Sequence, residues 1–201
     1  IGSPLQVIYI FLSPNPSSPL WWLAMLYHVY IVVLLLAFWR IHTKTVSRAL
    51  GTLIFLIAIG TSTTLGWLMG MTDARPTLNA SFFSVYFPLT GFASGIAALL
   101  LFSLASEGLR GRASAEKTAD LYNELAKIMG VIAGVVLILF AWRSIIGGIS
   151  STAEEFRAFK HMIGSIPYHI ELWLGLAAPT LLMLLPEIRK STWGKIAASF
   201  L

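Results

Sequence analysis

The sequence predicts an all-α protein, a polytopic transmembrane helical bundle that forms a single integral membrane domain over residues 1–201. The chain is 57% hydrophobic and only 11% charged, whereas soluble domains carry about 25% charged residues. About five stretches reach the roughly 20 mostly apolar residues that a membrane span needs. These stretches are residues 19–39, 46–71, 80–106, 121–149 and 167–185, and a further helix is expected to start at 193–201.

Helix signals delimit these spans. Ser18 is expected to cap the first one, and Pro19 suits its first helical position. The apolar segment before it, broken at residues 13–16, is expected to be the tail of a preceding helix or an interfacial piece. Pro88 and Pro179 are expected to kink the third and fifth spans. Glycine pairs at helix-packing spacing predict close helix contacts: Gly91 with Gly95, and Gly130 with Gly134.

Loop charges predict the orientation, because basic residues collect in loops on the cytoplasmic side. Three connections are rich in basic residues: Arg40, Lys44 and Arg48; Arg110, Arg112 and Lys117; and Arg189, Lys190 and Lys195. The alternate connections, including residues 72–79 and the segment between the fourth and fifth spans, are therefore expected outside. The net charge of +5 fits this arrangement. No nucleic acid partner is expected, because no basic patch is interleaved with stacking aromatic residues.

Several kinds of site are excluded. The chain has no cysteine, which excludes disulfides, cysteine-ligated iron–sulfur clusters, the usual structural zinc site and covalent c-type haem. No nucleophile elbow, phosphate-binding loop, EF-hand or zinc-binding HExxH helix is present, and no metal site is predicted. Haem b needs two histidines at matching depth on facing helices. His28 lies deeper than His169, so haem b is kept only as an alternative.

Polar residues inside the predicted spans are candidates for function, because ionisable groups in a membrane are costly. They come from four helices and all fall in the outer half of the bilayer: His28, Thr63, Thr64, Arg143, His169 and Glu171. We expect one polar pocket or proton entry on the outer side. Arg143 could alternatively extend its charged group to the membrane surface. Tyr27 and Tyr168 are candidate hydrogen-bond donors in the same pocket.

Five motifs, in order along the chain, resemble one membrane-protein family. They are Gly2-Ser3-Pro4; residues 13–22, Ser-Pro-Asn-Pro-Ser-Ser-Pro-Leu-Trp-Trp; Gly66-Trp67-Leu68-Met69-Gly70 followed by Ala74-Arg75-Pro76; Phe92-Ala93-Ser94-Gly95-Ile96-Ala97; and Glu171-Leu172-Trp173-Leu174-Gly175 with Pro179. The set is similar to NrfD/PsrC-type proteins, the membrane subunits of polysulfide-reductase-like complexes.

The resemblance implies an eight-helix fold, of which this chain would contain helices three to seven and the start of the eighth. It implies a multi-pass subunit of the prokaryotic cell membrane that binds a quinone, menaquinone or ubiquinone, as substrate near the outer face. Electrons would pass to or from an iron–sulfur subunit docked outside together with a catalytic subunit. The membrane chain itself would hold no redox cofactor and would not be catalytic alone. Some relatives are thought to couple this transfer to proton movement.

The resemblance also implies roles for individual residues. Glu171 matches an acidic residue often seen in the family's seventh helix, and we expect it to transfer protons together with His28. Asp73 and Arg75 lie in the loop that would face the iron–sulfur partner. Thr63 or Thr64 stands where many relatives have a histidine. Two alternatives are a secondary transporter or proton channel without a redox partner, and a haem b cytochrome anchor.

Overall fold

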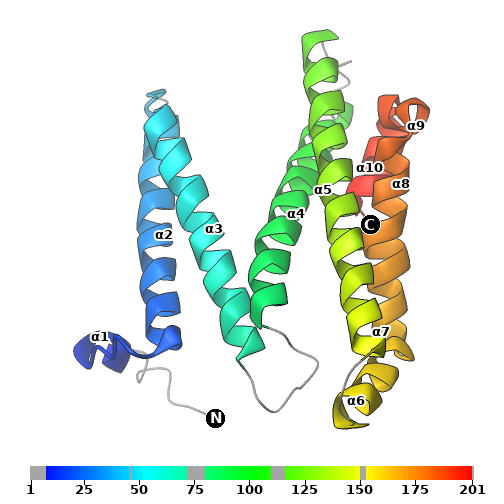
Figure 1. The fold of residues 1–201 in the computed structure, drawn as a ribbon. Helices are drawn as coiled ribbons and strands as arrows, with labels where there is room; N and C mark the ends of the chain where they lie inside the picture. The colour runs from blue at the N-terminus through cyan, green and yellow to red at the C-terminus, as the bar shows by residue number, and fades with distance from the viewer. Residues whose placement is uncertain (1–7, 46, 72–79, 110–115, 150–152, 201) are drawn as a thin grey trace. The chain divides into compact units, whose positions relative to one another are not determined.

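The computed structural model describes residues 8–45, 47–71, 80–109, 116–149 and 153–200. All regular secondary structure within these ranges is helical, which confirms the predicted all-α bundle. The chain forms two compact units, Ile1–Pro88 and Leu89–Leu201. Both units are built from long apolar helices and shorter helices near the helix ends (Figure 1).

The first unit is a helical hairpin. After the short α1 (Tyr9–Leu12), α2 (Pro19–His42) and α3 (Arg48–Gly70) lie side by side, and the start of α4 follows them. The predicted start of α2 is confirmed, since Ser18 is extended and Pro19 is the first helical residue, although the Ser18 side chain makes no capping hydrogen bond. Ser47 does cap α3, where its hydroxyl oxygen accepts from the Leu50 N–H at 3.4 Å.

The second unit packs around α5. Its elements are the remainder of α4 (Ala80–Leu109), α5 (Glu116–Gly148), α6 (Ala153–Ile163), α7 (Ile166–His169), the π-helix η2 (Ile170–Ala177), α8 (Ala178–Leu184), α9 (Pro186–Lys190) and α10 (Thr192–Phe200). The buried core joins four of these helices. It contains Ile96, Leu100 and Leu104 of α4, Tyr122, Ala126 and Met129 of α5, Met183 of α8 and Ala198 of α10.

Among the described residues, four helices are long and apolar enough to cross a membrane: α2, α3, most of α4 and most of α5. They coincide with the first four predicted spans within a few residues at each end. The fifth predicted span, residues 167–185, is a succession of α7, η2 and α8 rather than one regular α-helix. One expectation is corrected, because the connection before it contains an 11-residue helix, α6, and is not simply a loop.

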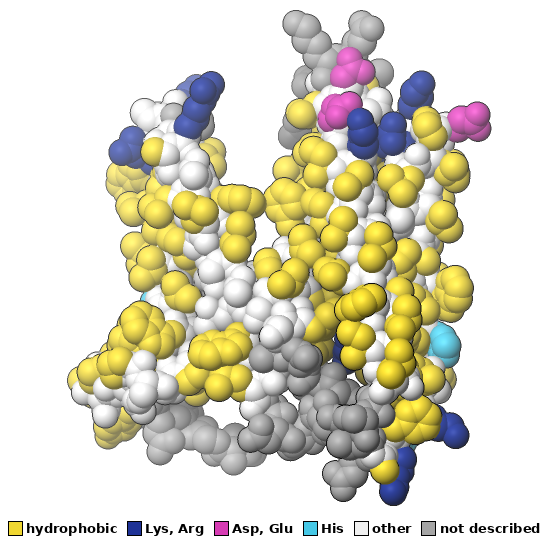
Figure 2. All heavy atoms as spheres, viewed as in Figure 1, with side chains coloured by type: hydrophobic (Ala, Val, Ile, Leu, Met, Phe, Trp, Pro, Cys, Tyr) yellow, Lys and Arg dark blue, Asp and Glu magenta, His cyan; other side chains and the backbone are white. Residues whose placement is uncertain are grey.

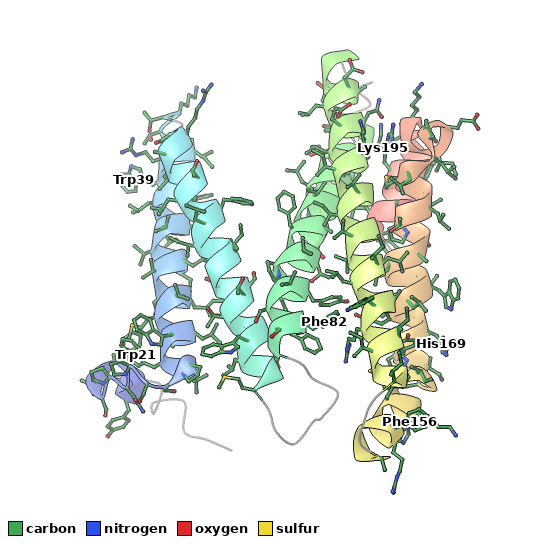
Figure 3. The ribbon with its side chains drawn as sticks, viewed as in Figure 1. Trp21, Trp39, Phe82, Phe156, His169 and Lys195 are labelled. Atoms are coloured by element: carbon green, nitrogen blue, oxygen red, sulfur yellow. The ribbon has the colours of Figure 1, made fainter. Side chains whose placement is uncertain are left out.

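Apolar side chains cover the lengths of the helices, and Lys and Arg gather near their ends (Figure 2). Trp21 and Trp39 lie at opposite ends of α2 (Figure 3). These two positions are 18 residues apart, which corresponds to about 27 Å along an α-helix at 1.5 Å per residue, close to the roughly 30 Å hydrocarbon core of a bilayer. This distribution is expected of helices that face lipid, with tryptophans at both membrane boundaries.

The glycine pair of α5 makes the close helix contact that its spacing predicts. A Cβ on Gly130 would lie 2.6 Å from Met183 Cβ, and a Cβ on Gly134 would lie 3.4 Å from Thr180 Cγ2. Both contacts bring α8 against α5. The pair Gly91 and Gly95 of α4 differs, because no neighbouring atom of the described structure lies within 4 Å of a Cβ at either position.

Candidate functional site

The second unit has a compact corner where α5 ends and α6 and α7 fold back onto it. Phe159 of α6 is buried and lies against the glycine pair at the end of α5. A Cβ on Gly147 would come within 2.5 Å of Phe159 Cδ2, whereas a Cβ on Gly148 would keep an ordinary 3.6 Å from the ring. The missing side chain of Gly147 therefore lets α6 approach α5. The orientation predicted from the loop charges would put this end of α5 on the outer side.

Tyr168 of α7 is fixed against α5 within this corner. Its ring packs against the Phe140 ring in a tilted arrangement with centroids 5.1 Å apart, and its hydroxyl lies 2.7 Å from Ser144 Oγ. Ser144 Oγ donates to the Phe140 carbonyl oxygen at 2.9 Å. A serine hydroxyl has a single proton to give, so Tyr168 must be the donor to Ser144. The Tyr168 proton is thus already used within the protein.

Arg143 lies one position before Ser144 on α5 and is half-buried. Its Nη2 is 3.5 Å from the sulfur of Met162, which belongs to α6. A thioether is only a weak acceptor, so this contact positions the guanidinium without neutralising it.

His169 and Glu171 lie where α7 passes into η2, and both side chains are exposed. The His169 ring meets the Tyr168 ring edge-on, with centroids 5.5 Å apart. Glu171 belongs to the first turn of η2. π-helical segments are rare and occur often at functional sites. The structure therefore places the predicted residues Arg143, Tyr168, His169 and Glu171 around one end of the second unit.

His28 is the predicted site residue of α2, and it is exposed in the first unit. Its Nδ1 lies 2.6 Å from the Ala24 carbonyl oxygen, and its ring meets Phe11 of the segment before α2 edge-on at 4.6 Å. A carbonyl oxygen can only accept a hydrogen bond, so Nδ1 carries the proton. In the neutral ring, Nε2 then keeps a lone pair that can accept a proton or a hydrogen bond.

The other predicted residues of the first unit differ in what their hydroxyl groups do. Thr64 Oγ1 donates to the Gly60 carbonyl oxygen of its own helix at 2.8 Å. Thr63 and Tyr27 make no such bond within the part of the chain that the structure describes. Of the two threonines that the sequence analysis named, Thr63 is therefore the one whose hydroxyl is available to a ligand. Tyr27 is exposed and remains a candidate hydrogen-bond donor.

The predicted single pocket joins residues of both units, and the relation between the units is not defined, so that pocket stays a prediction. Asp73 and Arg75, predicted to face a partner, lie outside the described residues. Within the described ranges no three His, Asp or Glu side chains group in a way that could hold a metal ion.

Sequence reasoning missed the supporting residues of the corner, Ser144, Gly147 and Phe159. A signal existed for Phe159: Phe156, Phe159, Met162 and Ile163 recur at helical spacing and alternate with charged residues, which is typical of an amphipathic helix. The Gly147-Gly148 pair was a weaker sign of a close approach. No local pattern links Ser144 to Tyr168, because these residues are 24 positions apart.

Comparison with known proteins gives one result. A family model described as "Polysulphide reductase, NrfD" matches residues 1–200, nearly the whole chain. Searches of curated proteins and of solved structures gave no significant match.

Proposed function

This chain belongs to the NrfD family of polysulphide reductase membrane subunits, and from that premise we propose that it is the quinone-interacting anchor of a multi-subunit respiratory oxidoreductase. The observation that carries the proposal is the family match over residues 1–200. Four candidate membrane spans among the described residues make the chain a multi-pass membrane protein. The proposed location is the prokaryotic cytoplasmic membrane.

In this proposal the chain binds a quinol or quinone near its outer face and holds no redox cofactor of its own. Oxidation of a quinol releases two electrons and two protons. The electrons pass to an iron–sulfur subunit docked outside, which is joined to a catalytic subunit, and the protons leave through side chains of this chain. The reverse direction uses the same groups. The chain alone is therefore not a catalyst.

Glu171 is the proposed proton donor and acceptor. Its exposed carboxylate lies in the first turn of η2, beside exposed His169 and in the unit that also contains Arg143. A carboxylate next to basic side chains can exchange a proton with a quinone oxygen. His28 contributes the Nε2 lone pair described above. We propose that these groups, with Tyr27, Tyr168, Thr63 and Thr64, line the quinone pocket and its proton route.

The decisive experiment replaces Glu171 by Gln in the assembled complex. Glu171→Gln keeps the shape of the side chain and can still form hydrogen bonds, but its amide can neither give up nor take up a proton at neutral pH. We expect quinone-coupled turnover to fall at least about tenfold, within the range typical of general acid–base groups, with assembly unchanged. Glu187→Gln, which changes an exposed acid on α9, is the matched control and should retain turnover. Equal turnover in both variants would remove Glu171 from this role.

Purification of the intact complex tests the electron-transfer role. An iron–sulfur protein and a large catalytic subunit should co-purify with this chain. A chain isolated reproducibly without them would favour the transporter or proton-channel alternative. A b-type band in the reduced-minus-oxidised spectrum, assigned to this chain, would favour the haem anchor.

A further inference from the structure

Thr180, the third residue of α8, has a buried hydroxyl group without a hydrogen-bond partner. Its side chain is 6% exposed, and Oγ1 meets no acceptor or donor in the described structure. Buried threonines in a helix ordinarily bond the carbonyl four residues earlier. Thr61 and Thr64 of α3 do so, with Ile57 at 2.7 Å and Gly60 at 2.8 Å. An orphan hydroxyl inside a membrane bundle is costly, so Thr180 requires an explanation.

The backbone of the same junction, six residues before Thr180, also has an acceptor without its helical donor. The Ala178 N–H bonds the Trp173 carbonyl, five residues earlier, in the π-helical pattern. Pro179 has no N–H to donate. The Leu174 carbonyl would be served by Ala178 in an α-helix or by residue 179 in a π-helix, and neither donor is available to it. The junction of η2 with α8 thus combines an unused hydroxyl with a freed carbonyl.

Packing against α5 fixes the direction of the Thr180 side chain. Its methyl group, Cγ2, faces Gly134 of α5, where a Cβ would lie 3.4 Å away. One turn later Met183 fills the space in front of Gly130. Since the methyl group occupies the side towards Gly134, the hydroxyl cannot point the same way and turns elsewhere within the buried junction.

We propose that an ordered water molecule binds Thr180 Oγ1 at the junction of η2 with α8 and joins it by a second hydrogen bond to a backbone carbonyl oxygen of that junction. Water both donates and accepts, which matches a hydroxyl together with a carbonyl oxygen, and buried water typically serves such groups. Hydroxyl and carbonyl oxygens are also ligands of a sodium ion. However, α8 and residues 125–148 of α5 contain no Asp or Glu that would offset the charge of a cation, and Glu171, the acid of η2, is exposed in the first turn of that helix, nine residues before Thr180. A neutral ligand therefore fits this site better.

The test compares Thr180→Val with Thr61→Val in the purified complex. Valine has nearly the shape of threonine, so each variant removes a hydroxyl without leaving a cavity. If water links Thr180 to the backbone, Thr180→Val removes its anchor and should lower the melting temperature by about 2–4 °C more than Thr61→Val does. Thr180→Ser keeps the hydroxyl and should retain the water. A high-resolution map of the wild-type complex should show density within hydrogen-bonding distance of Thr180 Oγ1.

Each other outcome would overturn the proposal. An unliganded hydroxyl predicts that Thr180→Val leaves the melting temperature unchanged or raises it, because a buried unpaired group is removed. A sodium site predicts that sodium stabilises the wild type more than potassium does, and that Thr180→Val abolishes this difference. A map without density beside Thr180 would contradict the water directly. None of these measurements depends on quinone turnover, so their outcome tests the water site independently of the proposed function.

Discussion

Phe159 of α6 occupies the place where a side chain on Gly147 of α5 would lie, with its Cδ2 2.5 Å from the position of a Cβ. This contact attaches α6 to the C-terminal end of α5. It also places Met162, three residues after Phe159, against the guanidinium of Arg143. The position of Arg143, a proposed pocket residue, therefore depends on how closely α6 approaches α5 at Gly147.

Gly147→Ala should destabilise this corner. The new methyl group would overlap the Phe159 ring, and overpacking of this kind typically costs about 1–3 kcal/mol. Thermal unfolding of the purified complex, followed by loss of helical signal, measures the effect. Gly148→Ala is the control, because its methyl group would keep 3.6 Å from the same ring. The close approach is refuted if both variants melt at the same temperature.

Gly66→Ala should weaken the contact between α3 and the start of α4, because a methyl group there would overlap the Phe83 carbonyl and lie 2.9 Å from the Ser84 amide nitrogen. Backbone atoms cannot move aside as a flexible side chain can. Gly60→Ala on the same helix meets no neighbour within 4 Å and should stabilise α3 by up to about 1 kcal/mol through helix propensity. Opposite shifts in melting temperature are expected, and shifts of the same sign would contradict this packing.

Tyr168→Phe removes the hydrogen bond to Ser144 and keeps the ring on Phe140. The expected loss of stability is about 0.5–1.5 kcal/mol. Ser144→Ala should cost more, because it also removes the bond to the Phe140 carbonyl oxygen. The double variant should cost little more than Ser144→Ala alone, because both changes delete the bond between Tyr168 and Ser144. Denaturation of the four proteins gives the coupling energy of a double-mutant cycle. Strict additivity would show that the two hydroxyls do not interact.

Tyr27 and Tyr168 should differ in their effect on quinone binding. The proton of Tyr168 is donated to Ser144, so Tyr168 must give up that bond before it can donate to a quinone carbonyl. Tyr27 has no such commitment among the described residues. If both line the pocket, Tyr27→Phe should raise the KM for quinone more than Tyr168→Phe does. Steady-state kinetics at a series of quinone concentrations measure both KM values. A larger rise in KM for Tyr168→Phe than for Tyr27→Phe would make Tyr168 the principal donor.

The long helices could be predicted from the sequence because hydrophobic length and helix-start residues determine them locally. Pro19 begins α2 as expected. The helix continues past Trp39 to His42, since no helix breaker follows Trp39 directly. The glycine spacing of α5 likewise predicted a close contact, and Gly130 and Gly134 confirm it.

Other features could not be predicted because they depend on tertiary contacts or on a subtle change of hydrogen bonding. The π-helix η2 differs from an α-helix by one residue in its bonding pattern, and its composition, Ile-Glu-Leu-Trp-Leu-Gly-Leu-Ala, suits either form. Ser144 is one of many small polar residues until α7 brings Tyr168 beside it. The outer-half cluster was predicted from depth along each helix, and depth alone does not define which faces meet.

The π-helical stretch gives the chain a place where its length can change. Hydrogen bonds that reach five residues back hold one residue more than an α-helix would along the same path. Loss of one residue between Ile170 and Ala177 could be absorbed by rewinding that stretch as an α-helix, with Thr180 and Met183 still facing α5. The same loss within α5 would rotate one half of that helix against the other by about 100°. Such a shortening in η2 would leave the bundle assembled and would redirect the carboxylate of Glu171.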